Sequence, residues 1–460
     1  MFSSQTYQKR RAALGKEMAS GVALFMGNGE TPYNYPANAY RFRQDSSFLY
    51  CFGINEPDMA ALADFDEGIA YLFGNESTLD DVIWMGEQPS MADRANAAGV
   101  DNYFPLSALA EMVDRFMRQG RNIHYLPPYR GETRLQLFRL LGIHPDEQRE
   151  KASEALIRAV VKMRLVKEPQ EIDQIEQSMN TAYRMHTHVM RHARAGVTEQ
   201  ELAGAVEGIA AADGAVSFPV ILTVNGQTLH NHYHGNTLRN GQLLLTDAGS
   251  ETAMGYASDI TRTIPVGGKF DERQRLIYQT VLNANLKAIE LSRPNVAYRD
   301  VHLAVARVIA GGLQQAGLMK GDMDDAVAQG AHSLFFPHGL GHAMGLDVHD
   351  MEGMGENYVG YDDTVRRSTQ FGLSSVRFGR KLEAGYVVTD EPGIYFIPAL
   401  MNRWEADRKY EQFINYGALT AYRDFGGIRI EDDLLITPEG CRVLGKPIPK
   451  SVEELENICK

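Results

Sequence analysis

Four segments in the second half of the chain carry an acidic residue at one end of an apolar, strand-like run. The segments read "GQLLLTDAG", "ASDITRTIPVGG", "GYVVTDEPGIYF" and "GGIRIEDDLLIT", and the acids in them are Asp247, Asp259, Glu391 and Glu431. Acidic side chains are rarely buried unless they are paired or bound to a cation. The fold must therefore expose these carboxylates at turns and caps, or gather them around positive charge.

Convergence of the four acids would create a site for two divalent cations, whose charges offset four carboxylates. Two-metal sites of this kind activate water for hydrolysis. Oxygen-rich ligand sets favour hard ions such as Mn²⁺ or Mg²⁺, and an imidazole ligand shifts the preference toward transition metals. The segment "PHGLGHAMGLDVHD" (337–350) contains three histidines and could supply that imidazole. Its glycine spacing does not match the GxGxxG phosphate-binding pattern.

Composition excludes several classes of partner. The chain has 460 residues and a formal net charge of −13, which argues against nucleic acid or an anionic membrane as the main partner. Its three cysteines form no CxxC pair, which fits a reducing compartment and argues against structural zinc. The first residues lack the apolar core of a signal peptide, and no apolar run is long enough for a transmembrane helix. We expect a cytoplasmic protein.

The first part of the chain, residues 1–157, is predicted to form an α/β domain. The runs "GVALFMG" (21–27) and "IAYLFG" (69–74) are short, apolar and closed by glycine, as buried strands often are. Residues 106–120 show helical spacing and end at a glycine.

A second domain is predicted over residues 158–460. Pro169 stands where a proline suits the first turn of a helix. Thr198 and Glu201 in "TEQE" form a capping-box pattern that predicts another helix start.

These motifs resemble the pita-bread metallopeptidases, and in particular the Xaa-Pro peptidase branch that includes aminopeptidase P and prolidase. The words that carry the resemblance are "DAG…ASDITRT", "HGLGHAMGLDVHD", "EPGIYF" and "GGIRIEDD", with "YRFRQDSSFLYCFGINEPD" (40–58) in the N-terminal part. The resemblance implies an α/β N-terminal domain followed by an α+β pita-bread catalytic domain. It also implies five metal ligands: Asp247, Asp259, His342, Glu391 and Glu431.

The resemblance further assigns roles around the metals. Two divalent ions, Mn²⁺ in first place with Co²⁺, Fe²⁺ or Zn²⁺ as alternatives, would share a bridging hydroxide that attacks the peptide bond. Glu391 would act as general base and then as acid. The other residues with implied catalytic roles are His230, His338, His349 and Arg429. Arg377 would bind a substrate carboxylate, and Tyr395 is a candidate hydrogen-bond donor to the reaction intermediate, or else a packed aromatic residue.

Two features depart from the family pattern. Asp247 and Asp259 are twelve residues apart where eleven is usual, which should lengthen a hairpin connection without removing a ligand. Asp390 precedes Glu391 at a position where relatives often have an apolar residue. Separately, His232 and His234 alternate with His230, so an extended strand would place all three on one face.

The implied activity is that of a metal-dependent exopeptidase that cleaves the bond before proline in peptides. Aminopeptidase P, which removes the N-terminal residue from longer Xaa-Pro peptides, is the first expectation. Prolidase, which cleaves Xaa-Pro dipeptides, is the alternative, because the spacing of forty residues from Glu391 to Glu431 and the segment that fills it resemble prolidases more. A non-catalytic peptide-binding scaffold is a distant third, since the implied ligands are all present. By analogy with the family we also expect a homodimer or homotetramer.

Overall fold

The computed structural model describes residues 1–460, which form two compact units. Unit 1 contains Met1–Arg164 and Glu352–Tyr358, and unit 2 contains Leu165–Met351 and Val359–Lys460. The chain thus passes from unit 1 to unit 2 near the end of helix α7 (Glu154–Leu165), and the later segment Glu352–Tyr358 again belongs to unit 1. The sequence pattern does not predict that this later segment belongs to unit 1.

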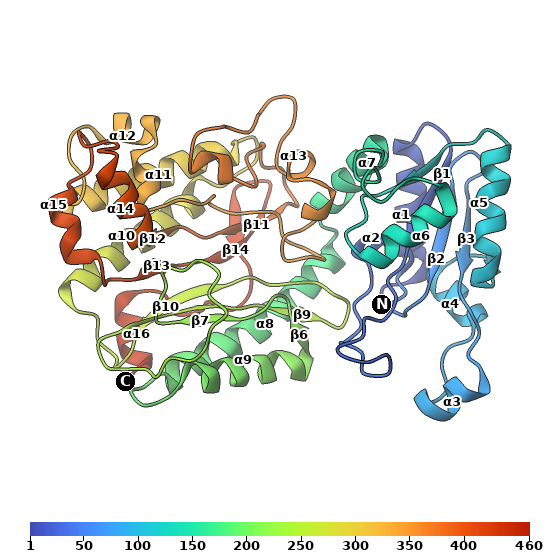
Figure 1. The fold of residues 1–460 in the computed structure, drawn as a ribbon, viewed down its shortest axis with the longest axis horizontal. Coiled ribbons are helices and arrows are strands. Elements are labelled where there is room, and N and C mark those ends of the chain that lie inside the picture. Colours follow the sequence, from blue (N-terminus) through green and yellow to red (C-terminus); the bar gives the residue numbers. More distant parts are fainter. The chain divides into compact units, whose positions relative to one another are not determined.

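Unit 1 is built on a five-stranded sheet with the strand order β4-β3-β2-β1-β5 (Figure 1). The central strands pair antiparallel, and both edge strands run parallel to their neighbours. The strands are β1 (Val22–Met26), β2 (Ala60–Asp64), β3 (Ile69–Phe73), β4 (Asn102–Phe104) and β5 (Ile123–Tyr125). The helices besides α7 are α1 (Ser4–Glu17), α2 (Ser46–Phe52), α3 (Leu79–Met85), α4 (Met91–Ala98), α5 (Leu109–Arg118) and α6 (Gly131–Leu141).

The three predicted elements of this domain are confirmed. The run 21–27 contains β1, which is buried, and the run 69–74 contains β3, which is buried only toward its end. The helical run 106–120 forms a short 3-10 turn and then α5, and the chain turns at Gly120 with a positive φ of 76°. Apolar side chains of α5 pack on the sheet and form the core of the unit.

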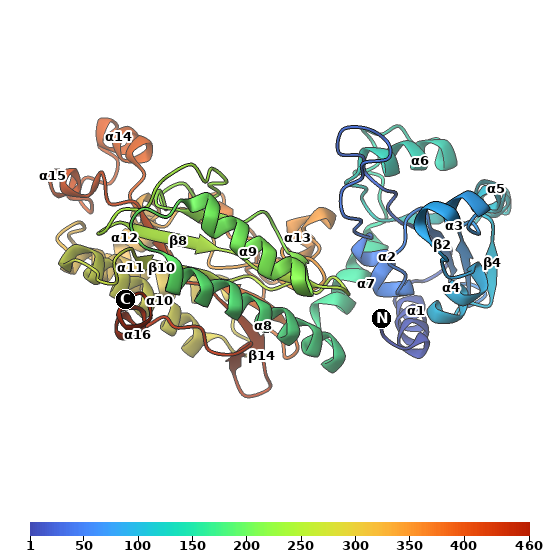
Figure 2. The same ribbon diagram turned by 90° about the horizontal axis from the view of Figure 1, so that it is seen from below.

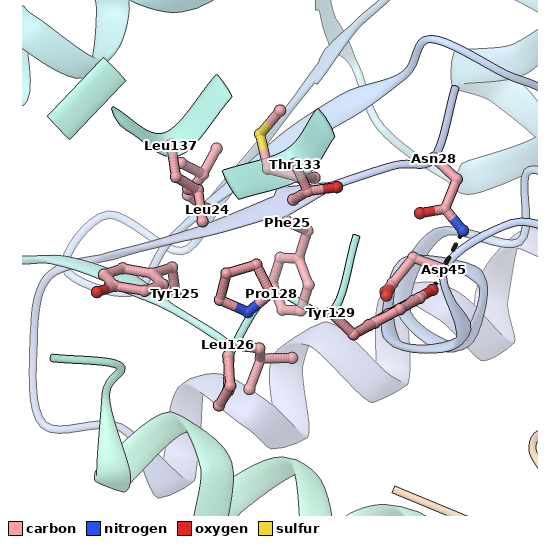
Figure 3. A pocket seen from close by; sticks show the side chains of 12 residues that line it. Leu24, Phe25, Asn28, Asp45, Tyr125, Leu126, Pro128, Tyr129, Thr133 and Leu137 are labelled. Atoms are coloured by element: carbon pink, nitrogen blue, oxygen red, sulfur yellow. Dashed lines mark hydrogen bonds between the residues drawn. The ribbon is translucent and has the colours of Figure 1, made fainter. Parts of the chain in front are cut away.

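A small cavity of about 40 Å³ lies beside β1 in unit 1 (Figure 3). Leu24, Tyr125 and Leu137 line one part of it, and Asn28, whose amide donates to the hydroxyl of Tyr129, lines another. A cavity of this size holds a water molecule or two but no peptide. It contains none of the predicted site residues.

Unit 2 combines long helices with several small antiparallel sheets (Figure 1). Its sheets have the strand orders β10-β8-β7, β11-β14-β15, β12-β13 and β6-β9. The strands are β6 (Gly214–Val216), β7 (Ile221–Thr223), β8 (Leu243–Asp247), β9 (Ser250–Thr252), β10 (Thr261–Pro265), β11 (Val387–Asp390), β12 (Gly393–Tyr395), β13 (Gly427–Arg429), β14 (Asp432–Ile436) and β15 (Cys441–Val443). This α+β arrangement follows the expectation for the second domain.

Four of the longest helices of unit 2 lie in pairs, α8 beside α9 and α10 beside α11 (Figures 1 and 2). The helices are α8 (Pro169–His192), α9 (Glu199–Asp213), α10 (Glu272–Leu291), α11 (Tyr298–Gln315), α12 (Met323–Gln329), α14 (Pro398–Ala406), α15 (Tyr416–Leu419) and α16 (Val452–Ile458), while the short α13 (Glu356–Val359) ends at the second crossing between the units. Pro169 opens α8 and Thr198 caps α9 in a capping box with Glu201, as the sequence predicts. None of the helices has the length and apolar character needed to cross a lipid bilayer.

Candidate metal centre

The strand registers of unit 2 bring the four predicted acids together. Asp247 ends β8 and pairs with Thr261 of β10, so Asp259 lies just beyond the same strand pair. Strands β11 and β14 pair Asp390 with Asp432, and strands β12 and β13 pair Gly393 with Arg429.

These last two ladders share one register, so Glu391 stands opposite Glu431 in the gap between them. The gap has a local cause, because Pro392 has no N–H to donate to a ladder. Its carbonyl still accepts a hydrogen bond from the Ile430 N–H at 3.3 Å. Like charges directly opposite each other destabilise a strand pair. The register therefore creates a need for positive charge at this point.

Three overlapping groups of side chains have ligand atoms within 4.8 Å of one another: Asp247, Asp259 and Glu431; His342, Glu391 and Glu431; and Asp259, His342 and His349. The five residues predicted as metal ligands therefore form one connected cluster. The extra residue between Asp247 and Asp259 falls in the connection that contains β9, and both carboxylates remain in the cluster. No other part of the chain forms such a group.

Burial and mutual repulsion dominate the electrostatics of the cluster. Burial, together with the charge of Glu431, raises the pKa of Asp259 well above its usual range. Burial and the charge of Glu391 do the same for the pKa of Glu431. The pKa of Glu391 rises to about 8, mainly through burial, while Arg429 opposes the rise. Such values are expected where carboxylates are held together for a cation that offsets their charge.

His342 is oriented so that one ring nitrogen faces the acids. Its Nδ1 lies 3.1 Å from the Ala343 carbonyl oxygen, and its Nε2 lies 3.4 Å from Asp259 Oδ2 and 3.8 Å from Glu391 Oε1. Burial lowers the pKa of His342 well below its ordinary value, so the ring is neutral at physiological pH. A neutral imidazole whose Nδ1–H donates to a carbonyl presents its Nε2 lone pair as a metal ligand.

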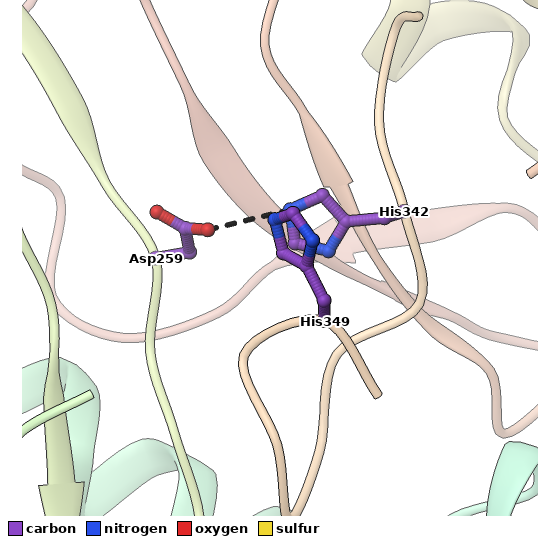
Figure 4. Close-up of side chains that lie close together, drawn as sticks. All are labelled: Asp259, His342 and His349. Carbon is purple, nitrogen blue, oxygen red and sulfur yellow. Dashed lines mark ion pairs between the residues drawn. The ribbon is translucent and has the colours of Figure 1, made fainter. Parts of the chain in front are cut away.

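His349 lies beside His342, with ring centroids 4.0 Å apart (Figure 4). The family resemblance implies a role for His349 toward the substrate only. The structure brings it close enough to Asp259 and His342 to share a metal ligand group with them. Its ring is half-buried, so it also borders the exposed side of the cluster.

His338, Tyr395 and Arg429 form a hydrogen-bonded chain beside the acids. His338 Nε2 lies 2.8 Å from the Tyr395 hydroxyl, and Arg429 donates to that hydroxyl at 3.0 Å. His338 Nδ1 lies 2.8 Å from the Gly339 carbonyl oxygen, so Nδ1 carries the proton and Nε2 accepts from Tyr395. Burial lowers the pKa of His338 to about 3 and raises that of Tyr395 to about 12. Tyr395 is therefore fully buried but not merely a packing residue.

Arg429 also joins this hydrogen-bonded chain to the predicted metal ligands. Its guanidinium donates to Asp247 Oδ2 at 2.6 Å and to the Thr261 hydroxyl oxygen at 3.0 Å. The same hydroxyl donates to Glu431 Oε2 at 2.7 Å. Thr261 therefore links Arg429 to Glu431, although the strand is interrupted between them.

The remaining predicted site residues lie at the edge of the cluster. The His230 side chain is exposed, and partial desolvation together with the charges of Arg429 and Arg377 lowers its pKa. The charge of Arg377 also acts on His338 and Glu391, which places the guanidinium at the site. The segment through His230, His232 and His234 is not part of a strand ladder. The rings of His232 and His234 face the backbone carbonyls of Val220 and Leu222, two positions apart on the neighbouring segment.

Comparison with known proteins identifies the family. Residues 173–438, more than half of the chain, match the family described as Metallopeptidase family M24. The chain belongs to this family. Residues 7–124 match the Aminopeptidase P, N-terminal domain. The Xaa-Pro aminopeptidase of Escherichia coli K12 is 32% identical, with 99% of this chain and 98% of that one covered. The Xaa-Pro dipeptidase of Homo sapiens is 29% identical over 95% of this chain and 88% of its own.

Solved structures give the same picture of the fold. The aminopeptidase PepP of Pseudomonas aeruginosa superposes with a TM-score of 0.82 at 27% identity, covering 100% of this chain and 98% of that one. The low-pH form of aminopeptidase P from E. coli gives a TM-score of 0.81 at 31% identity with the same coverage. Both have the pita-bread fold, so the predicted fold class is confirmed. The chain is an M24 metallopeptidase and therefore a hydrolase.

The donor set of this M24 metallopeptidase fits divalent metal ions. Asp247 Oδ1 is buried and has no hydrogen-bond partner, as expected for an oxygen left to a cation. Four carboxylates and one neutral imidazole supply hard oxygen donors and one nitrogen donor. Family membership and this cluster together make the chain a binder of divalent metal.

Sequence reasoning misses several residues that support the ligands. Asp433 Oδ2 accepts from the Asp259 N–H at 3.0 Å. Arg262 donates to the Glu431 carbonyl oxygen at 2.6 Å and pairs with Asp432 at 2.7 Å. The sequence features that could have pointed to them are the two aspartates of "EDD" and the Thr-Arg-Thr of "DITRT". Their roles depend on contacts across more than 160 residues of chain, which spacing alone does not reveal.

Proposed function

We propose that this protein is a metal-dependent Xaa-Pro aminopeptidase that hydrolyses the bond between an N-terminal residue and a following proline. One observation carries the proposal: the cluster of four acids and His342 adjoins the His338–Tyr395–Arg429 chain, in a protein that matches an E. coli Xaa-Pro aminopeptidase along nearly the whole length of both. Its substrates are then proline-containing peptides, and no nucleic acid or membrane is needed.

The proposed metal ligands are Asp247, Asp259, His342, Glu391 and Glu431. They would hold two divalent ions, Mn²⁺ in first place, with Co²⁺, Fe²⁺ or Zn²⁺ as alternatives. When bound, such ions polarise the scissile carbonyl and lower the pKa of a water molecule toward neutrality. Whichever ion is native, the buried acids of the chain then need not carry protons to remain inside the protein.

Glu391 is the proposed proton carrier of the reaction. Its side chain is about one-fifth exposed, more than that of Glu431, so it borders the space open to substrate. Burial raises its pKa to about 8 in the metal-free protein, so this carboxyl group can take up and lose a proton near neutral pH, as a group that alternates between base and acid must do. His338 lies 3.7 Å from Glu391 Oε2 and, being neutral, does not hold Glu391 in the ionised form.

Tyr395 has a narrower role here than a direct donor to the intermediate. Its proton is directed at His338 Nε2, while its oxygen accepts from Arg429. We infer that Tyr395 orients His338 and that Arg429 supplies positive charge next to Asp247. His230 and His349 border the same space and would bind the substrate, with Arg377 offering a guanidinium to its carboxylate end.

The test compares Ala-Pro with Ala-Pro-Ala as substrates of Mn²⁺-loaded protein. Release of alanine from Ala-Pro-Ala is expected, and cleavage of the dipeptide alone would refute the aminopeptidase and favour prolidase. Prolidase remains the second candidate because the human Xaa-Pro dipeptidase matches 95% of the chain. Glu391→Gln should abolish turnover with the fold intact, and Glu290→Gln, a change at an exposed acid, is the matched control.

A non-catalytic peptide-binding scaffold is the distant alternative. Metal analysis after Mn²⁺ reconstitution separates it from the enzyme: fewer than one metal ion per chain, with no peptidase activity, would revive it. We further propose that the protein is cytoplasmic, since its three cysteines are free as in a reducing compartment. We also propose that it forms a homodimer or homotetramer. Light scattering on the purified protein measures the assembly state.

A further inference from the structure

The loop between His342 and His349 is closed by its own contacts. The Asp350 N–H donates to the Ala343 carbonyl oxygen at 2.8 Å, which joins the two ends of the loop. Inside the loop, the Gly345 N–H donates to the Asp347 carbonyl oxygen at 3.0 Å. The position of the His349 ring relative to His342 therefore depends on how this loop is held.

A buried ion pair between Lys167 and Asp350 connects the end of this loop to another segment of the chain. Lys167 Nζ lies 3.1 Å from Asp350 Oδ2, and both side chains are 1% exposed. Lys167 stands three residues after unit 1 ends, and its N–H donates to the Gly385 carbonyl oxygen at 2.8 Å. The lysine is thus fixed to the segment that leads into β11, which carries Asp390 and is followed by Glu391. The pair connects the loop to the strand that precedes a proposed metal ligand.

Gly345 packs directly against this pair. A Cβ at Gly345 would lie 2.7 Å from Asp350 Oδ2 and 2.8 Å from Lys167 Cε. No side chain fits there unless the ion pair moves. The Gly345 carbonyl oxygen also accepts from the Ala257 N–H at 2.8 Å, two residues before Asp259. Lysine, aspartate and glycine therefore form one close-packed clasp, which we call the Lys167–Asp350 clasp.

Stability alone is a poor explanation for such a pair, because well-packed apolar residues often replace buried ion pairs without loss of stability. Fixing one geometry is the better explanation at a site where small displacements cost much rate. We propose that Lys167 and Asp350 are positioning residues that hold His349 against the substrate side of the metal centre. This role rests on the proposed peptidase function.

The first experiment replaces the pair by apolar residues. Lys167→Met alone leaves the Asp350 carboxylate buried without its ammonium partner and should lower the melting temperature. The double variant Lys167→Met/Asp350→Leu should regain the melting temperature, with kcat for Ala-Pro-Ala about 10- to 100-fold below the parent. Mn²⁺ affinity, measured by calorimetry, should not follow kcat. Lys162→Met, which removes the lysine of an exposed ion pair with Glu17, is the matched control.

A second variant keeps both charges. Gly345→Ala wedges the clasp apart at a backbone conformation that alanine adopts without strain, since Gly345 has no positive φ. We expect kcat to fall while KM and Mn²⁺ affinity stay near the parent values. Gly353→Ala, where an added Cβ meets nothing within 4 Å, is the control. Parent-like kcat in folded Gly345→Ala, or in the folded double variant, would overturn the positioning role.

Failure of the proposed function is distinguishable from failure of the clasp. If the parent hydrolyses neither Ala-Pro nor Ala-Pro-Ala with Mn²⁺, the peptidase assignment is wrong. The clasp is then judged by crystal structures of the parent and of Gly345→Ala. An unmoved loop 343–350 and an unmoved His349 ring would refute it, and a displaced ring would support it.

Discussion

Removing the metal should make the stability of this protein fall as pH rises above neutrality. Five buried carboxyl groups have raised pKa values: the predicted ligands Asp259, Glu391 and Glu431, and their neighbours Asp390 and Asp433. They keep protons in the folded, metal-free chain that the unfolded chain has already lost. The folded state then binds more protons than the unfolded state. Stability therefore decreases with increasing pH between the ordinary carboxyl pKa and the raised one.

The window from pH 6.5 to pH 8 isolates this effect. Below it, buried neutral histidines such as His338, whose pKa falls to about 3, add the opposite slope up to the ordinary histidine value near 6.5. Within it, Glu391, with a pKa of about 8 against an ordinary 4.5, costs about 2 kcal/mol of unfolding free energy. Asp259 and Glu431 act in the same direction, so the measured loss should be larger than this.

The assay is urea denaturation of chelator-treated protein at pH 6.5 and pH 8, with and without Mn²⁺. Glu391→Gln should reduce the loss by about 2 kcal/mol, because it removes one titrating group. Glu290→Gln, at an exposed acid, should leave the loss unchanged. Saturating Mn²⁺ should reduce the fall, because it binds the folded form in which the ligand acids are ionised. Metal-free stability that is flat or rises between pH 6.5 and pH 8 would refute the reasoning.

Three substitutions test the contacts around the ligands. Tyr395→Phe removes the partner of His338 Nε2 and should lower kcat about 10- to 100-fold while Mn²⁺ affinity stays unchanged in calorimetry. Thr261→Val removes the hydroxyl that Glu431 and Arg429 share and should weaken Mn²⁺ binding about 10- to 100-fold in the same measurement. Arg262→Met removes one of the two cations that pair with the buried Asp432, Lys450 being the other, and should lower the unfolding free energy by about 3 kcal/mol in urea. Arg307→Met, at an exposed pair, should change it little.

The four acids of the cluster were predictable because each one interrupts a local pattern. Asp247 follows a buried apolar strand, and Glu391 precedes a Pro-Gly turn, so short stretches of sequence already mark them as unusual. Helix starts were predictable for the same reason, since Pro169 and the capping box of Thr198 act within one turn of the helix. Local rules therefore suffice for elements and for single suspicious residues.

Contacts between distant residues could not be predicted in this way. The Lys167–Asp350 clasp joins residues 183 positions apart. His302 and His332 have no motif partner in the sequence, yet their rings lie 6.3 Å apart in the core. The alternation of His232 and His234 likewise does not reveal which backbone groups they meet, the carbonyl oxygens of Val220 and Leu222.

The metal centre lies where the pairing between two strands is interrupted. Strands β11 and β14 and strands β12 and β13 keep one register on both sides of Pro392, which sets Glu391 opposite Glu431. Two opposed carboxylates would oppose folding if both were ionised, and burial makes the cost greater. The raised pKa values mean that Glu391 and Glu431 are neutralised by protons when metal is absent. When metal is bound, the cations offset their charges. The arrangement that raises the carboxyl pKa values of the metal-free site is therefore the same one that makes the site suitable for metal ions.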